Sequence, residues 1–233
     1  MTVPDPKRKL YRRRFSSSCH SRMYHNHPSS RLKDLFVAKP YQGVSPDKAK
    51  FLFVGLDANY GASIESDPIF SKIVEYHEDG AQFWRKYNVH HPFLLPTYSG
   101  DGKKFHQRFA KIGFTKDQSD DVSFAELMDL PTTGRSRLEP SDVSQIHLER
   151  LRDWILNGAA QYVFFPAGVS RILRQSGIYD WIPPRPIGQD GQLQVLFEDS
   201  RKKIYQHLHF SNFGKFEIRL QQEAADIRRL ISI

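Results

Sequence analysis

The sequence predicts a three-layer α/β/α sandwich, in which helices cover both faces of a central, mostly parallel sheet of four to five strands. Short apolar runs without alternation, such as those at 51–54 and 162–165, are typical of strands buried on both faces. Segments with helical periodicity separate these runs. The chain of 233 residues, 39% of them hydrophobic, is long enough to bury a sizeable core.

The expected elements follow from apolar runs for strands and from spacing, caps and breakers for helices. Phe105, Phe109 and Ile112, for example, share one helical face, and Gly113 ends that helix. In chain order, we expect strands at 50–55, 122–128, 162–165, 192–197 and 203–208, and helices at 68–87, 103–112, 142–157, 168–175 and 216–230.

Start and stop signals support the later elements. Ser141 or Asp142 is a suitable cap for the third helix, and Gly158 ends it. A proline-rich loop at 183–186 separates the fourth helix from the last two strands. Because strands and helices alternate without an internal repeat, we expect a single domain over residues 34–233.

The net charge of +8 is concentrated at the start of the chain. Residues 1–33 hold nine lysines or arginines and one acidic residue, so positions 34–233 carry equal numbers of each sign. We expect a disordered basic arm at 1–33, of the kind that attracts nucleic-acid phosphates. A solvated tail without a partner is the alternative. A transit peptide is a third interpretation, against which Pro4 and Pro6 argue.

Cysteine content and hydropathy limit the class of protein. The single cysteine, Cys19, excludes disulfide frameworks and four-cysteine metal sites. No stretch approaches the roughly 18 apolar residues of a membrane helix. We therefore expect a soluble intracellular protein, cytoplasmic in a bacterium and nuclear or mitochondrial in a eukaryote. His20, His25 and His27 lack acidic neighbours, so we expect no metal site there.

Two strands end in polar loops that could hold catalytic groups. The strand at 51–54 leads into a loop with Asp57, and the strand at 204–208 leads into a loop with His209. Ligands of open parallel sheets bind beyond the carboxyl ends of the strands. If these strands are parallel neighbours, one crevice receives both the carboxylate and the imidazole, which could stabilise charge on opposite sides of a breaking bond.

Five segments follow one another along the chain: Gly-Leu-Asp-Ala-Asn-Tyr-Gly at 55–61, the helix ending in Gly-Phe-Thr at 113–115, the segment 126–132 ending in Pro-Thr, the strand at 162–168 and His-Phe-Ser-Asn at 209–212. Their order resembles the uracil-DNA glycosylase superfamily, especially its mismatch-specific uracil/thymine branch. The resemblance covers about residues 50–230 in collinear order. It departs from the family at Ala58 and Phe210, where the family has proline, and in roughly 30 extra residues at 62–91.

This resemblance implies two catalytic residues. Asp57 would position the attacking water and stabilise positive charge on the sugar. His209 would donate a hydrogen bond to the negative charge on the departing base, and His207, two residues earlier, could substitute for it. The structural alternatives are a capping role for Asp57 and a backbone hydrogen bond for His209.

The resemblance also implies a pocket for a base flipped out of the DNA helix. Phe93 is the best match for the aromatic platform under that base, and Tyr98 is the second; both could equally be core residues. The remaining substrate-binding residues come from the two motif loops: Gly55, Leu56, Tyr60 and Ser211.

DNA contacts are expected on two loops. Phe213 lies where the family inserts an apolar wedge into the base stack, although packing against the last helix would explain it as well. Thr132, Thr133 and Arg135 could hold phosphates, or form a simple polar turn. Asn212 and Lys215, which flank Phe213, complete the expected DNA-binding residues.

The leading hypothesis is a monofunctional DNA glycosylase that hydrolyses the N-glycosidic bond of uracil or a related deaminated or mismatched base. We expect DNA as partner, a monomer, and no metal or other cofactor. One alternative is a non-catalytic nucleic-acid-binding module on the same fold. Another is a small nucleoside hydrolase that uses Asp57 with Glu65 or His209.

Overall fold

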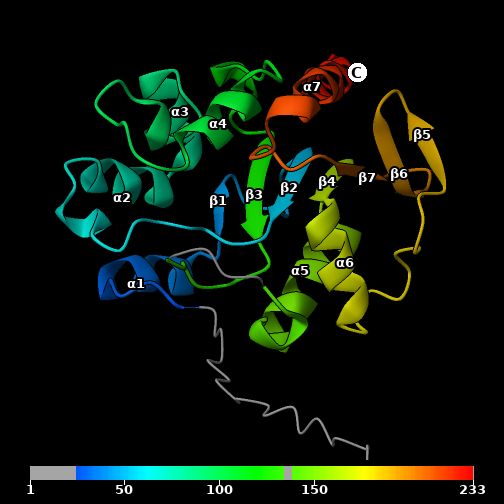
Figure 1. The fold of residues 1–233 in the computed structure, drawn as a ribbon, viewed down its shortest axis with the longest axis horizontal. Coiled ribbons are helices and arrows are strands. Elements are labelled where there is room, and N and C mark those ends of the chain that lie inside the picture. Colours follow the sequence, from blue (N-terminus) through cyan, green and yellow to red (C-terminus); the bar gives the residue numbers. More distant parts are fainter. Residues whose placement is uncertain (1–24, 134–137, 233) are drawn as a thin grey trace, which may run out of the picture.

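The computed structural model describes residues 25–133 and 138–232, in which one mixed sheet of seven strands has the order β1-β3-β2-β4-β7-β6-β5 (Figure 1). The four central strands run parallel: β3 (Val122–Glu126), β2 (Phe51–Gly55), β4 (Tyr162–Pro166) and β7 (Lys203–His207). The outer strands pair antiparallel: β1 (Tyr41–Gly43) with β3, β6 (Leu193–Glu198) with β7, and β5 (Gly188–Asp190) with β6. The predicted α/β class and a mostly parallel centre are confirmed.

The predicted strand number of four to five is wrong, because β1 and β5 were missed. Each has three residues, which is too short to show an apolar run or an alternation. The helices are α1 (Ser30–Ala38), α2 (Phe70–Glu78), α3 (Gly80–Tyr87), α4 (Lys103–Ala110), α5 (Gln145–Asn157), α6 (Ala167–Gln175) and α7 (Glu217–Ile231). Single 3₁₀ turns cover Ile64–Ser66, Pro92–Leu94, Lys116–Gln118, Pro140–Asp142 and Gly214–Phe216.

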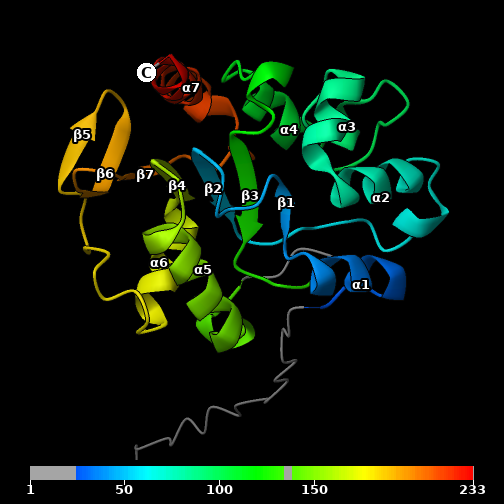
Figure 2. The same cartoon turned by 180° about the vertical axis from the view of Figure 1, so that it is seen from behind.

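Helices cover both faces of the sheet (Figures 1 and 2). On one face, α5 and α6 contribute Leu151 and Ile172 to a core that includes Leu52 of β2. On the other, α4 and α7 pack against an aromatic core centred on Phe53, whose ring stacks on that of Phe164 with centroids 4.7 Å apart. Because neighbouring residues of β2 are buried on opposite faces, the strand has the apolar run without alternation seen in the sequence.

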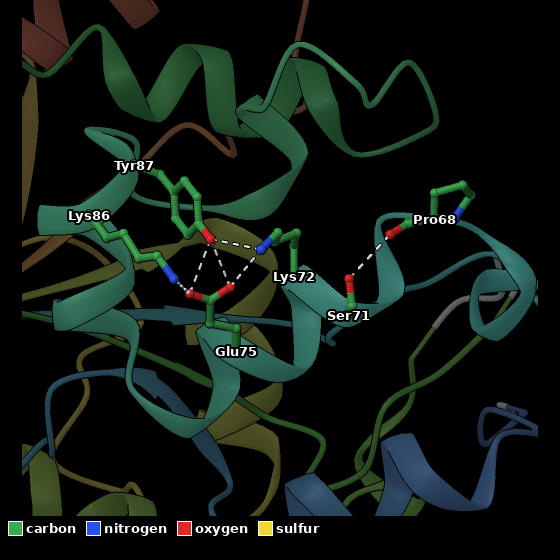
Figure 3. Close-up of polar contacts among 6 residues, drawn as sticks. All are labelled: Pro68, Ser71, Lys72, Glu75, Lys86 and Tyr87. Carbon is green, nitrogen blue, oxygen red and sulfur yellow. Dashed lines mark hydrogen bonds and ion pairs between the residues drawn. The ribbon is translucent and has the colours of Figure 1, made fainter.

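The segment predicted as one helix over 68–87 is two helices. Asp79 interrupts it in an extended conformation, with φ −145°, and its side chain accepts a hydrogen bond from the N–H of Gln82 to cap α3. Figure 3 shows how the two helices are joined: the Glu75 carboxylate of α2 accepts hydrogen bonds from Lys86 and Tyr87 of α3 and from Lys72. The bond from Lys86 is the main cause that lowers the pKa of Glu75, to about 2.

Two predicted boundaries also shift, one at the start of a helix and one at the end of the basic arm. The cap of α5 is Ser144, whose hydroxyl accepts from the N–H of His147, because the expected cap Asp142 belongs to a 3₁₀ turn. At the other end of the chain, α1 begins at Ser30 and crosses the predicted arm boundary at residue 33. The folded unit therefore starts at least at residue 25, while the rest of the predicted arm, residues 1–24, lies outside the described residues.

In the ranges that the structure describes, no helix combines the length and the apolar character needed to cross a membrane.

Candidate active site

A cavity of about 530 Å³ lies at the carboxyl ends of the parallel strands. Asp57 follows β2 and His209 follows β7, and both line this cavity although they come from distant parts of the chain. In the sheet, β2 and β7 are parallel and are separated by β4 alone, so their loops reach the same cavity without the strands being direct neighbours. All five predicted substrate-binding residues line the same cavity: Gly55, Leu56, Tyr60, Phe93 and Ser211.

The Asp57 carboxylate is held on one side. Its Oδ2 atom accepts hydrogen bonds from the hydroxyl of Thr132 and from Nδ2 of Asn59, the latter at 3.1 Å. Asn59 Nδ2 also lies 3.3 Å from Thr132 Oγ1, so the three side chains form one network. Within the described residues, Oδ1 of Asp57 has no hydrogen-bond partner and is available to a ligand or water in the cavity.

Backbone pairing fixes the loop that carries Asp57. The N–H of Thr132 donates to the carbonyl of Ala58, and the N–H of Tyr60 donates back to the carbonyl of Thr132, each at 3.0 Å. Asn59 and Thr132 form an isolated parallel bridge. The loop therefore continues the pairing of β2 with β3 beyond the ends of both strands.

Residues 25–29, which we call the N-terminal strap, support this loop from outside. Asn26 forms an antiparallel bridge with Thr132, and the N–H of Thr133 donates to the carbonyl of His25 at 3.1 Å. The buried His27 donates from Nε2 to the carbonyl of Gly61 at 3.0 Å. The strap was predicted to be disordered, and it is ordered because both of its edges find backbone partners.

His209 has a defined tautomer when neutral. Its Nδ1 atom accepts a hydrogen bond from the N–H of Ser211 at 3.1 Å, so the ring proton is on Nε2. Burial lowers the pKa of His209, with the nearby Asp57 acting in the opposite direction. A neutral imidazole with Nε2–H is a hydrogen-bond donor that adds no net charge to the cavity.

His207 occupies a different place. Its side chain is buried under Phe210, with ring centroids 4.9 Å apart, and Nδ1 donates to the carbonyl of Leu208 at 2.7 Å. Burial lowers the pKa of His207 to about 3. Because it does not line the main cavity, His207 is a packing residue and does not substitute for His209.

Glu126, at the end of β3, is a cavity residue that the sequence analysis treated only as part of a motif. Burial, together with the charge of Asp57, raises the pKa of Glu126 well above its ordinary value. Its carboxyl group occupies the space over Gly55, where a Cβ atom would lie 2.0 Å from Oε2. This contact explains the glycine at position 55. The sequence signal that could have identified Glu126 as a site residue is its place as an acidic residue at the end of a central parallel strand.

Phe93 forms part of an aromatic wall of the cavity. It is 3% exposed and stacks on Tyr98, with centroids 4.2 Å apart and an interplanar angle of 12°. The side chain of His91 caps the 3₁₀ turn by accepting from the N–H of Phe93 at 3.2 Å. Both residues proposed from sequence as the aromatic platform are therefore present, and they support each other.

The predicted DNA-binding residues fall into three groups. Thr132 is fully buried and its hydroxyl binds Asp57, so its predicted phosphate contact is corrected to a role in positioning. Thr133 lines the cavity, and Arg135 lies outside the described residues. On the surface beside Ser211, Phe213 is 76% exposed, Lys215 is exposed and Asn212 is half-buried.

A groove of about 430 Å³ lies next to the cavity, along α6. Gly168 and Arg171 line both the cavity and the groove, and Arg174 lines the groove. Arg174 donates to the carbonyl of Pro183 at 3.1 Å, whereas Arg171 is exposed and forms no ion pair within the described part of the chain. No carboxylate is among the described residues that line the groove, so it is a positively charged extension of the cavity mouth.

Residues 25–133 and 138–232 contain no group of three or more histidine, cysteine, aspartate or glutamate side chains arranged to hold a metal ion. No protein-family model matches the chain, and no curated protein is significantly similar to it. Functional interpretation therefore rests on the site itself.

Proposed function

We propose that this chain is a DNA glycosylase that hydrolyses the N-glycosidic bond of uracil or a related deaminated or mismatched base flipped out of DNA. One observation carries the proposal. The Asp57 carboxylate, held by a hydrogen bond from Thr132, and the His209 imidazole, which has Nε2–H as a donor when neutral, line the same cavity of about 530 Å³. This volume is within the range of small-molecule sites, about 300–1,000 Å³. The mostly parallel sheet with helices on both faces is compatible with the three-layer sandwich of the uracil-DNA glycosylase superfamily.

The chemistry divides between the two residues. As the glycosidic bond breaks, its electron pair moves to the base, and positive charge develops on the sugar. The free Oδ1 of Asp57 orients a water molecule toward the anomeric carbon and accepts its proton, while the negative carboxylate stabilises the sugar. Nε2–H of His209 donates to the oxygen of the departing anionic base. The products are the free base and a sugar that carries the new hydroxyl group.

Glu126 sets the charge of the site. Burial, together with the charge of Asp57, raises the pKa of Glu126 well above its ordinary value and so favours its neutral form. Two adjacent negative charges, which would oppose each other, are thereby avoided. A protonated Glu126 also adds a second hydrogen-bond donor to the cavity.

The surface around the cavity suits a nucleic-acid strand. Phe213 is exposed on the loop after His209, where a wedge could fill the space left by a flipped base. Arg171 and Arg174 are placed to neutralise phosphates along the groove. We expect the basic residues that precede the strap in the sequence to add to the attraction of phosphates, because the strap itself is bonded to Thr133.

Base release from short duplexes tests the proposal. The substrates carry U opposite G, T opposite G, or hypoxanthine opposite T, and the matched control is Asp57→Asn, which keeps the shape of the side chain. We expect release by the wild type and a loss of about 10²–10⁴-fold in the variant, with DNA binding retained. Wild-type turnover by Asp57→Asn would contradict the assignment.

The competing functions have distinct outcomes. A non-catalytic binding module, suggested by Ala58 and Phe210 in place of the family prolines, would bind these duplexes in a salt-sensitive manner without releasing a base. In a small nucleoside hydrolase, Glu65 was one candidate partner of Asp57, but Glu65 is exposed on a 3₁₀ turn and does not line the cavity.

Deleting the first residues of the chain tests whether the substrate is DNA or a small nucleoside. The deletion ends at residue 24, because residues 25–29 brace the Asp57 loop. For a DNA enzyme, we expect a weaker salt dependence of DNA affinity after truncation. An unchanged salt dependence would mean that residues 1–24 do not contact phosphate.

A further inference from the structure

Three histidines gather on the wall of the cavity. His91 and His106 line it, and their rings stack with centroids 3.5 Å apart at an interplanar angle of 5°. His90 lies behind them, with Nε2 at 3.2 Å from Nδ1 of His106. Neither the predicted catalytic residues nor the predicted DNA contacts include this group.

The hydrogen bonds of His91 define what it presents to the cavity. Its Nδ1 atom accepts from the N–H of Phe93 at 3.2 Å, so the neutral ring carries its proton on Nε2. The side chain is 3% exposed, and Nε2 has no partner in the part of the chain that the structure describes. Because His91 lines the cavity, this free N–H can donate to a ligand or water there.

His106 presents a second unpaired ring nitrogen beside the first. Its Nδ1 atom is occupied by His90, and Nε2 has no partner among the described residues. If Nδ1 donates to His90, Nε2 of His106 is an acceptor. The two stacked rings, with centroids 3.5 Å apart, then carry one free donor and one free acceptor, and burial lowers the pKa of both histidines, which favours their neutral forms.

We propose that His91 and His106 bind the lactam edge of a planar heterocyclic ligand: Nε2–H of His91 donates to a carbonyl oxygen, and Nε2 of His106 accepts from the adjacent N–H. Among bases attached to a sugar, uracil, thymine and hypoxanthine have this edge, whereas cytosine and adenine lack it. The inference rests on the proposed function for the identity of the ligand as a base. It goes beyond that function by naming the residues that select deaminated bases over their amino counterparts.

Binding of free bases tests the proposal without requiring catalysis. 1-Methyluracil, whose N1 is blocked as it is in a nucleotide, and 1,3-dimethyluracil are titrated into the full chain, with affinity followed by NMR shift changes, because the second methyl group removes the remaining N–H of the lactam edge. We expect 1-methyluracil to bind at least about tenfold more tightly than 1,3-dimethyluracil. His91→Phe and His106→Phe, which keep a stacked ring, are expected to abolish that preference.

Two further variants serve as controls. His91→Gln places an amide donor near the position of Nε2 and is expected to recover part of the preference. His77→Gln changes a buried histidine that does not line the cavity and is expected to leave it intact. Thermal unfolding of each variant confirms that it is folded, and ¹⁵N signals of the imidazoles in the wild type report the two tautomers directly.

The outcomes distinguish this proposal from the proposed function. If the wild type releases uracil from DNA but His91→Phe and His106→Phe bind 1-methyluracil and 1,3-dimethyluracil as the wild type does, the lactam-edge assignment is overturned and the glycosylase stands. If uracil binds through the two histidines but no duplex loses its base, the glycosylase fails and the recognition site stands. A ¹⁵N spectrum with the ring proton of neutral His106 on Nε2 rather than on Nδ1 would also contradict the proposal.

Discussion

The two loops that meet at the cavity differ in how firmly they are held. The Asp57 loop, residues 55–61, is bound by the Thr132 segment and by the N-terminal strap, through both side chains and backbone. The His209 loop, residues 209–214, has fewer attachments: Arg108 donates to the carbonyl of Phe210 at 3.0 Å, and the N–H of Asn212 donates to the carbonyl of His209. Beyond these bonds it reaches the surface.

This difference matches the tasks proposed for the two loops. Orienting a water molecule toward a carbon atom requires a carboxylate fixed in advance, because small misplacements reduce rates strongly. A loop that meets duplex DNA has to follow a substrate that changes shape when a base flips out. Gly214, with φ +65°, gives the second loop a conformation that other residues rarely adopt, directly after the exposed Phe213.

Among the variants that test the difference between the two loops, His209→Ala is expected to have the largest effect on base release. Removing the Nε2–H donor should reduce base release by about 10²–10³-fold, because one hydrogen bond to the departing base is lost. Single-turnover kinetics on a uracil duplex measure this loss. Ile218→Ala, which changes an exposed residue of α7 that does not line the cavity, is the control. Equal rates for His209→Ala and the wild type would remove His209 from the mechanism.

Thr132→Val breaks the brace on the rigid loop while preserving its shape. Losing the hydroxyl frees Oδ2 of Asp57, and we expect base release to fall about tenfold and unfolding free energy by about 1–3 kcal/mol. Thr133→Val, in a residue that lines the cavity without bonding to Asp57, serves as control in kinetics and urea unfolding. If both variants behave alike, the brace has no special role.

Acid is expected to weaken the His209 side of the site through His207. The folded-state pKa of His207 is about 3, below the ordinary value of 6.5, so the unfolded chain binds more protons between these values. Stability is therefore full above pH 6.5 and is lost as pH falls toward 3, by about 1 kcal/mol at pH 5.5 from this group.

Urea unfolding at pH 7.5 and 5.5 measures that loss. Buried His90 and His77, with pKa values lowered to about 3 and about 4, act in the same direction and add to the wild-type change. His207→Phe should reduce the difference between the two pH values. An identical difference in wild type and variant would show that His207 does not couple folding to pH.

The smallest effect concerns the tip of the His209 loop. Because Phe213 is 76% exposed, Phe213→Ala should change stability by less than about 0.5 kcal/mol. If Phe213 acts as a wedge, however, the substitution should lower base release from duplexes several-fold and leave base release from single strands unchanged. Ile218→Ala, which removes a 72% exposed apolar side chain on α7, is the control. Equal losses on duplex and single strand would argue against a wedge.

Local patterns explain what the sequence could predict. Central strands were found because residues buried on two faces form apolar runs, and the meeting of Asp57 with His209 followed from the common edge of parallel strands. The strap was missed because the bond between residues 25 and 133 leaves no periodic signal in either segment. The histidine wall was missed for a similar reason: His91 caps a 3₁₀ turn, His106 lies on α4, and the two meet only through packing.

The contacts that hold Asp57 also bear on the order in which parts of the protein fold. Thr132 and Asp57 are 75 positions apart in sequence, and the strap must then reach the same threonine from the start of the chain. Contacts of such separation form late, because the intervening chain must first be ordered by nearer partners. During refolding, burial of the tryptophans should therefore precede recovery of the cavity. We therefore expect the site to be completed late in folding.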